Sequence, residues 1–112
     1  MKSIDSGPTD TPILEETIGE NFERTVVADP DAEALVDVAS GRRWTYGELN
    51  DEIDIVARGL MALGIERGER VGIWAPNCPE WTILQYATAK MGAILVNINP
   101  AYRTHELAYV LK

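Results

Sequence analysis

The stretch AKMGAILVNINPAYRTHEL, at residues 89–107 of the 112-residue chain, decides the fold. Its first residues predict the end of a helix and a glycine that stops it, and Ala93–Asn97 then predicts a buried strand. An Asn-Pro pair turns the chain after this strand, and Thr104 is expected to cap the helix that follows. Helices and strands that alternate in this way are typical of an α/β fold.

The residues before this stretch complete a strand–helix–strand unit. Arg70–Trp74 predicts a strand, and Pro79–Met91 predicts a helix with proline in its first turn. Apolar residues lie around much of this helix, so we expect it to be broadly buried. A crossover helix of this length predicts two parallel strands with a right-handed connection.

A helix and a β-hairpin are expected in the first half of the chain. Thr17 and Glu20 have the spacing of a capping box, and Asp29-Pro30 should end the helix that they begin. The segments Ala34–Asp37 and Arg42–Thr45 flank a Ser-Gly turn, a pattern that predicts two paired strands.

The helix after the hairpin has the clearest boundaries. Thr45 and Glu48 again have capping-box spacing, and Gly64 can adopt the left-handed conformation that ends a helix. Apolar residues recur every three or four positions and define a face that we expect to be buried. These residues are Leu49, Ile53, Val56, Leu60 and Leu63.

Two regions are expected along the chain. Residues 1–12 are rich in polar, glycine and proline residues and predict a flexible tail, whereas residues 13–112 carry the periodic patterns. The last apolar pattern, with Leu107, Val110 and Leu111, still continues where the sequence stops. A core of two parallel strands also leaves sheet edges open. We therefore expect an incomplete piece of a larger α/β domain, with a β-hairpin and a parallel βαβ unit flanked by helices.

Composition and charge narrow the classes of function. The net charge is −8 and the isoelectric point is near 4.5, so the surface should repel phosphate backbones and no nucleic-acid binding is expected. The sequence has no apolar run of membrane-spanning length and no signal-peptide pattern. A single cysteine cannot form an internal disulfide, which suits a reducing compartment. We expect a cytoplasmic protein without a transmembrane segment.

Ligands of open parallel sheets bind beyond the carboxyl ends of the strands. Two loops occupy such positions, residues 75–78 and Asn99–Arg103, and both precede helix N-termini, which favour anions. The alternative interpretation is structural. In that case Asn77 or Cys78 only caps a helix, and Asn99-Pro100 only turns the chain.

No catalytic or metal-binding residue is assigned from the sequence. Cys78 would need a base to act as a nucleophile, and the single histidine, His105, belongs to a later element. A small, inert cysteine is therefore the simpler interpretation. No second histidine or cysteine lies at metal-ligand spacing. The sequence contains neither G-x-G-x-x-G nor G-x-x-x-x-G-K-[ST], so no loop that cradles phosphates is expected.

Three segments resemble motifs near the start of AMP-forming acyl-CoA synthetases, which belong to the adenylate-forming enzyme superfamily. They are RWTYGELN (43–50), GERVGIWAPNCPEW (68–81) and the stretch 89–107, in the order and spacing of that family. The segment NPAYRTHEL is most similar to medium- and long-chain fatty-acid–CoA ligases. Since the resemblance runs from about Phe22 to Lys112, it implies that residues 13–112 are a truncated N-terminal part of an AMP-binding domain.

The resemblance also implies an activity for the intact protein. Members of the family use ATP and Mg²⁺ to convert a fatty acid into an acyl-adenylate, and they then transfer the acyl group to CoA. The family's phosphate loop, hinge aspartate and C-terminal lysine would all lie beyond Lys112. The resemblance therefore implies a fragment that is inactive alone, binds none of these cofactors tightly and has the remainder of the synthetase fold as its partner. Lipid substrates further imply peripheral contact with membranes.

One candidate site is implied by the family resemblance. In related synthetases the loop equivalent to Asn99, Pro100 and Ala101 lies near the nucleotide part of CoA. Tyr102 and Arg103 adjoin this loop, and Arg103 would bring a positive charge to a phosphate. The resemblance thus implies a CoA-proximal loop at residues 99–103.

Two other functions stay open at this point. A non-catalytic interaction module would keep the family's N-terminal fold and bind a partner through its open sheet edge. A small nucleotide- or flavin-binding domain would use the βαβ unit, although the glycine fingerprint of such domains is missing.

Overall fold

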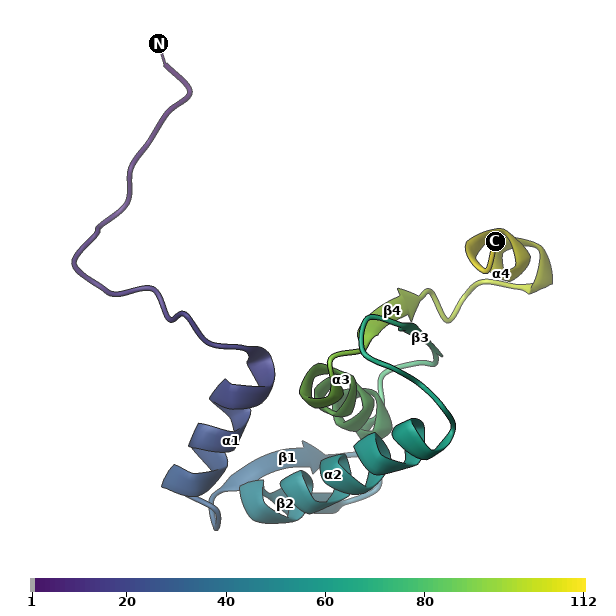
Figure 1. Cartoon of the computed structure of the whole chain (residues 1–112), viewed down its shortest axis with the longest axis horizontal. Helices are drawn as coiled ribbons and strands as arrows, with labels where there is room; N and C mark the ends of the chain where they lie inside the picture. Colours follow the sequence, from purple (N-terminus) through teal and green to yellow (C-terminus); the bar gives the residue numbers. More distant parts are fainter. Residues whose placement is uncertain (1) are drawn as a thin grey trace.

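The computed structural model describes residues 2–112, whose strands form two separate small sheets (Figure 1). The elements in chain order are α1 (Ile18–Ala28), β1 (Glu33–Asp37), β2 (Arg42–Thr45), α2 (Tyr46–Ala62), β3 (Arg70–Trp74), α3 (Pro79–Met91), β4 (Ile94–Ile98) and α4 (Thr104–Val110). The hairpin, the parallel βαβ unit and the flanking helices confirm the predicted α/β fold. Residues 2–16 contain no helix or strand and lead away from α1, and their flexibility stays a prediction.

Both strand pairs have the directions that the sequence predicts. β1 and β2 are antiparallel, with Leu35 opposite Trp44. β3 and β4 are parallel, with Val71 beside Leu95. The predicted crossover is thus present, and α3 connects the two parallel strands along the chain.

The strand β4 begins one residue later than predicted. Gly92, with φ of 81°, ends α3 in the left-handed conformation. The next N–H group, that of Ala93, donates to the Thr88 carbonyl at 2.9 Å and is therefore still used by the helix end. Pairing with β3 starts at Ile94, whose N–H donates to the Glu69 carbonyl at 2.8 Å.

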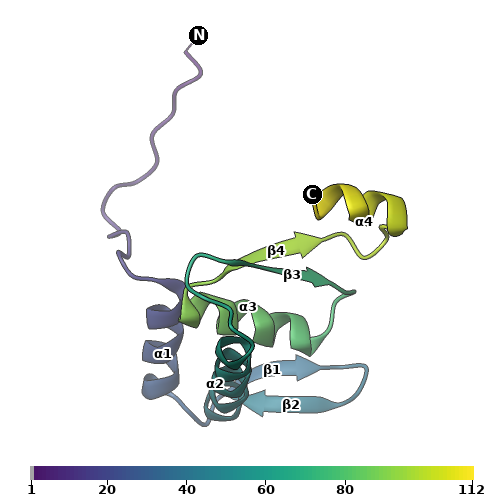
Figure 2. The same ribbon diagram turned by 45° about the vertical axis from the view of Figure 1, so that its right-hand side comes forward.

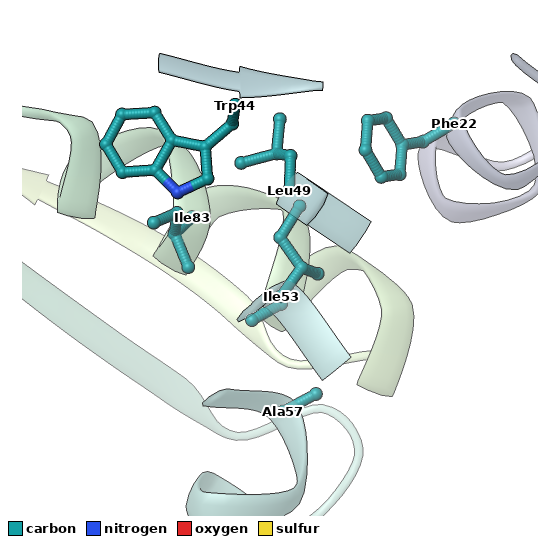
Figure 3. Close-up of a cluster of buried hydrophobic side chains, with 7 residues drawn as sticks. Phe22, Trp44, Leu49, Ile53, Ala57 and Ile83 are labelled. Atoms are coloured by element: carbon teal, nitrogen blue, oxygen red, sulfur yellow. The ribbon is translucent and has the colours of Figure 1, made fainter. Parts of the chain in front are cut away.

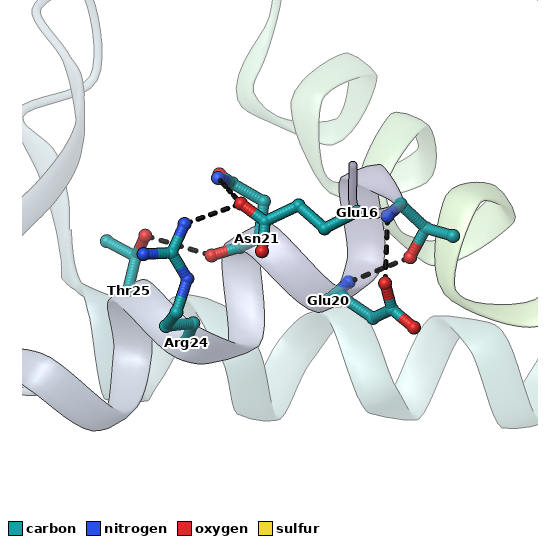
Figure 4. A network of polar contacts seen from close by, with 6 residues as sticks. Glu16, Glu20, Asn21, Arg24 and Thr25 are labelled. Atoms are coloured by element: carbon teal, nitrogen blue, oxygen red, sulfur yellow. Dashed lines mark hydrogen bonds and ion pairs between the residues drawn. The ribbon is translucent and has the colours of Figure 1, made fainter. Parts of the chain in front are cut away.

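The helix α1 begins with the predicted capping box (Figure 4). The Thr17 hydroxyl accepts from the Glu20 N–H at 3.1 Å, and the Thr17 N–H donates to the Glu20 carboxylate at 2.9 Å. The Glu16 carboxylate beside this box accepts from the side chains of Asn21 and Arg24. Two backbone donors at the start of α1, the N–H groups of Thr17 and Glu20, are therefore satisfied by the capping box, and the neighbouring Glu16 carboxylate is paired.

The helix α2 also begins with a capping box, in which Thr45 and Glu48 exchange bonds of 3.2 and 2.9 Å. Gly64, just beyond the helix, has φ of 92°. Both predicted boundaries of this helix are confirmed, because each depends only on residues within one turn of it.

The predicted apolar face of α2 is buried over part of its length. Leu49 and Ile53 are buried, and Val56 and Leu60 are half buried. Leu63 is 81% exposed, so its predicted burial is wrong. The reason is that Leu63 is the C-cap residue, beyond the part of the helix that packs against a neighbour.

The predicted cap of α4 is also wrong. Thr104 is the first helical residue, and Arg103 occupies the N-cap position. The Arg103 N–H donates to the Glu106 carboxylate at 3.2 Å, and arginine has no side-chain acceptor with which to return the bond. No residue of α4 is buried, and the helix projects away from the body of the molecule (Figure 1).

The core lies where α2 crosses α3, next to the hairpin (Figures 2 and 3). Ile53 of α2 and Ala87 of α3 are completely buried. Side chains from α1, β2, α2 and α3 form one cluster, and α1 packs against both α2 and α3. The buried members are Phe22, Trp44, Leu49, Ile53, Ala57, Ile83 and Ala87. The predicted broad burial of α3 is thus confirmed on the side that faces the other helices.

A buried ammonium group joins the three helices of this core. The Lys90 side chain is 9% exposed, and its Nζ lies 2.8 Å from Asp54 Oδ1 and 3.1 Å from Glu23 Oε1. The same Nζ donates to the Asn50 amide oxygen and lies 5.7 Å from the centre of the Phe22 ring. α1, α2 and α3 therefore meet around a single charge that is fully provided with partners.

The parallel strands present different surroundings on their two faces. Ile73 is buried toward the helices, and Val71 lies on the same face because side chains alternate along a strand. The opposite face carries Trp74 and Ile94, which are 49% and 47% exposed. Gly72 lies between them on this face, and its missing side chain leaves room for Ile98.

We predict that Lys90→Met destabilises the chain by about 1–2 kcal/mol, because Asp54 and Asn50 lose a charged hydrogen-bond donor while the aliphatic packing is kept. Urea unfolding followed by circular dichroism measures this change. The matched control is Arg43→Met, which breaks an ion pair with Glu33 whose two side chains are 61% and 52% exposed, and which should cost under about 1 kcal/mol. Equal effects of the two variants would contradict a structural role for the buried charge.

Candidate functional site

The carboxyl ends of β3 and β4 lie at the same edge of the parallel pair (Figure 2). From this edge one loop, residues 75–78, leads into α3, and the other loop, residues 99–103, leads into α4. Both loops predicted to lie at the strand ends are therefore placed side by side by the parallel pairing.

A direct bond connects the two strand ends. The indole N–H of Trp74, the last residue of β3, donates to the backbone carbonyl of Asn99 at 3.1 Å. Asn99 is the first residue after β4, and Trp74 pairs in register with Ile98, the last residue of that strand. The bond therefore ties the beginning of the second loop to the end of the neighbouring strand.

Asn99 also organises its own loop. Its side-chain oxygen accepts from the Ala101 N–H at 2.9 Å, and its backbone carbonyl accepts from the Tyr102 N–H at 3.0 Å. These bonds form the Asn-Pro turn that the sequence predicts. Asn99-Pro100 thus turns the chain, as the structural interpretation predicts. The turn leaves the exposed side of the loop open to a ligand.

A wide, open hollow of about 580 Å³ lies between Trp74 and this loop. Its wall consists of Trp74, Pro100, Ala101, Tyr102, Arg103 and Thr104. Arg103 is exposed, and among residues 2–112 its guanidinium group has no carboxylate within ion-pair distance. Four of the five predicted site residues line the hollow, and the fifth, Asn99, holds them in place.

Trp74 is the member of this site that the sequence analysis missed. The sequence pattern places it only at the end of the predicted strand Arg70–Trp74. The available signal was its position as the last strand residue, since an indole N–H that is not in the core needs an acceptor nearby.

The loop after β3 shows no comparable site. Cys78 occupies the N-cap position of α3, but its side chain makes no capping hydrogen bond, and Asn77 lies outside the cap position, so neither side chain caps the helix. Cys78 is a half-buried free thiol, and His105 is exposed on α4. In the described part of the chain no hydrogen bond joins these two residues.

An ion pair connects this region to the hairpin. The Arg42 guanidinium lies 3.1 Å from the Glu80 carboxylate and 5.2 Å from the centre of the Trp44 ring. The backbone N–H of Glu80 itself, and then Arg42, hold the pKa of the Glu80 carboxyl below its ordinary value. The first turn of α3 is therefore anchored to β2 by a charge that acid can remove.

Two further properties concern residues 2–112 as a whole. No three histidine, cysteine, aspartate or glutamate side chains gather closely enough there to hold a metal ion. None of the helices in this range is both long and apolar enough to cross a bilayer.

Comparisons with known proteins agree on the family. A family model described as AMP-binding enzyme matches residues 22–112. The chain is 44% identical over 106 residues to a mitochondrial medium-chain acyl-CoA ligase, ACSF2, of Macaca fascicularis, covering 95% of this chain and 17% of the relative. It is 46% identical over 111 residues to the acyl-CoA ligase sidI of Aspergillus fumigatus, covering 99% of this chain and 19% of that protein.

A solved structure shows the same architecture. The N-terminal domain of FACL13 from Mycobacterium tuberculosis superposes with a TM-score of 0.82 at 33% identity, over 86% of this chain and 24% of that one. The shared fold and the sequence identity thus define the N-terminal region of an adenylate-forming enzyme. The chain belongs to the AMP-binding enzyme family. It spans about a sixth of the length of the curated relatives it matches, some of which are named as mitochondrial, so the predicted cytoplasmic location stays a prediction.

We predict that Glu80→Gln lowers the melting temperature near neutral pH and not in acid. A carboxyl with a lowered folded-state pKa stabilises the chain fully above its ordinary value, roughly pH 5 and higher, and this contribution is lost as the pH falls through the folded value. Melting curves at about pH 7 and about pH 3 measure the difference. Glu15→Gln, which removes a carboxylate without a hydrogen bond in the described chain, should have no effect at either pH. A Glu80→Gln effect that persists unchanged in acid would contradict a stabilising role of the ionised Glu80 carboxylate.

Proposed function

We propose that residues 13–112 are the N-terminal part of an ATP-dependent acyl-CoA ligase that acts on a medium- or long-chain fatty acid, with residues 1–12 as a flexible tail. The observation that carries this proposal is identity of 44–46% to acyl-CoA ligases across 95–99% of the chain, including the loop at the strand ends. We propose the cytoplasm, with peripheral contact to lipid surfaces, as its location.

The proposed reaction has two steps. The fatty-acid carboxylate attacks the α-phosphate of ATP, which forms an acyl-adenylate and releases pyrophosphate, with Mg²⁺ neutralising phosphate charge. The thiol of CoA then loses its proton and attacks the acyl carbonyl, which forms the thioester and releases AMP. Adenylation makes the second step possible because AMP leaves far more easily than an oxide ion.

The loop at residues 99–103 is proposed to receive the nucleotide part of CoA in the second step. Asn99, Pro100 and Ala101 form a turn whose backbone is fixed by internal bonds, and Tyr102 borders the hollow beside it. Arg103 adds an exposed positive charge without a carboxylate partner in residues 2–112, which suits a phosphate. Support for this role comes from the open hollow and from the charge of the loop.

The 112 residues alone are proposed to be inactive and to bind ATP, Mg²⁺ and CoA weakly. The chain contains no glycine-rich phosphate loop, and the described strand-end loops supply one cation, Arg103, toward the hollow. Three phosphates and a metal need more donors than this. The remainder of the synthetase fold is therefore the proposed partner.

We predict that the 112-residue chain produces no acyl-adenylate above background in an ATP–pyrophosphate exchange assay with fatty acids of about 8 to 16 carbons. The control is the whole ligase with the same sequence at its start, which should turn over with the same substrates. Turnover by the short chain would contradict its proposed dependence on the rest of the fold. A whole protein that is inactive toward every acid tested would favour the alternative function, a non-catalytic interaction module.

We predict that Arg103→Gln in the whole ligase raises KM for CoA about three- to tenfold, because an exposed charge-assisted contact to phosphate is lost. Adenylate formation, measured separately by pyrophosphate exchange, tests whether the effect is confined to the thioester step. The matched control is Arg58→Gln, which removes an exposed arginine of α2 far from the strand ends and should leave KM unchanged. An unchanged KM in Arg103→Gln would contradict the proposed role of the loop.

A further inference from the structure

Trp74 is placed differently from the other two tryptophans of the chain. Trp44 is buried in the core, and Trp81 is half buried on α3. Trp74 is 49% exposed, yet its indole N–H has a defined acceptor, the Asn99 carbonyl, at 3.1 Å. An exposed indole can bind water instead, so burial alone does not require this bond.

The acceptor is the most heavily used carbonyl of the loop. Asn99 accepts from the Trp74 indole and from the Tyr102 N–H through the same oxygen. Its side-chain oxygen accepts from the Ala101 N–H two residues ahead. A shift of the Asn99 peptide would therefore disturb the bonds that shape the whole turn.

The last residue of β4, next to this bond, is also closely packed. Ile98 is 5% exposed, and its Cδ1 lies 3.0 Å from the position that a Cβ on Gly72 would occupy. Ile98 thus lies over the bare backbone of β3, directly beside Trp74, its partner in the parallel register. The Trp74 indole N–H then binds the carbonyl of Asn99, the residue that follows Ile98 at the point where the strand pairing ends.

We propose that Trp74 is a positioning residue that sets the orientation of residues 99–103 through the Asn99 carbonyl. Its indole ring forms one wall of the hollow while its N–H holds the opposite wall in place. The consequence for ligand binding rests on the proposed function of the loop. The proposed effect of Trp74 on the order of residues 99–103 does not depend on that function.

The first experiment uses the 112-residue chain and amide hydrogen exchange by NMR. Trp74→Phe should raise the exchange rates of the Ala101 and Tyr102 amides about fivefold, the order expected for the loss of one neutral hydrogen bond. Trp81→Phe, which removes an indole of α3 outside the loop, should leave both rates unchanged. Replacement of Trp74 by benzothienylalanine, which keeps the bicyclic shape and replaces the N–H with sulfur, should behave like Trp74→Phe. Wild-type exchange rates in Trp74→Phe would overturn the proposal.

The second experiment uses the whole ligase and separates KM from kcat. Trp74→Phe should raise KM for CoA about fivefold and lower kcat at saturating CoA by less than about twofold, because the loop can still adopt the bound shape. If Arg103→Gln raises KM and Trp74→Phe does not, the positioning role is overturned while the loop keeps its proposed function. If neither variant changes KM, the proposed function of the loop fails, and the ligand part of the inference fails with it.

Discussion

Helix α3 has to be buried on two sides at once, because α1 and α2 lie on one side of it and the parallel strands on the other (Figure 2). Two polar side chains on these sides of α3 have partners, one within the helix itself and one on the neighbouring helices. The buried Thr88 hydroxyl lies 2.9 Å from both the Leu84 and Gln85 carbonyls and bonds back to its own helix. Lys90 carries its charge to Asp54 and Glu23 on the neighbouring helices. With these groups satisfied, α3 can serve as the common support of the helical layer and of the sheet.

The strand-end site follows from this support. Because α3 connects β3 to β4 in parallel, both strands end at the same edge and the register places Trp74 beside Ile98. The side chain of Trp74 can then reach Asn99, one residue beyond the paired segment. No residue of the helical core touches the hollow, so changes in the core should act on the loop only through the strands.

Local patterns predicted the parts of the fold that depend on neighbours in sequence. The Thr17 and Thr45 capping boxes, the left-handed Gly64 and Gly92 and the parallel βαβ unit needed only propensities and spacing. The errors lie at element ends. Leu63 continues a helical pattern beyond the packed part of α2, and Glu106 accepts the Arg103 N–H, which makes Arg103 the N-cap in place of Thr104.

The contacts that matter most for the site could not be predicted in this way. The bond from Trp74 to Asn99 spans 25 residues, and the pair of Lys90 with Asp54 spans 36. Both form only when the strands are in register and the helices have packed, and neither corresponds to a periodic pattern in the sequence. The loop at residues 99–103 follows from its position at a strand end and from the family resemblance, whereas its support by Trp74 is visible only in three dimensions.

The internal bonding of the loop bears on how it would bind a ligand. A flexible loop loses conformational entropy when it closes on a ligand, and this loss weakens binding. Within residues 99–103 the chain's own groups restrict the backbone, because Asn99 accepts bonds from Trp74, Ala101 and Tyr102. Arg103 follows directly after this fixed turn, and its own N–H is held by Glu106. The backbone around the cation is therefore held by bonds within the chain, so the ordering cost of binding a ligand should fall mainly on the arginine side chain.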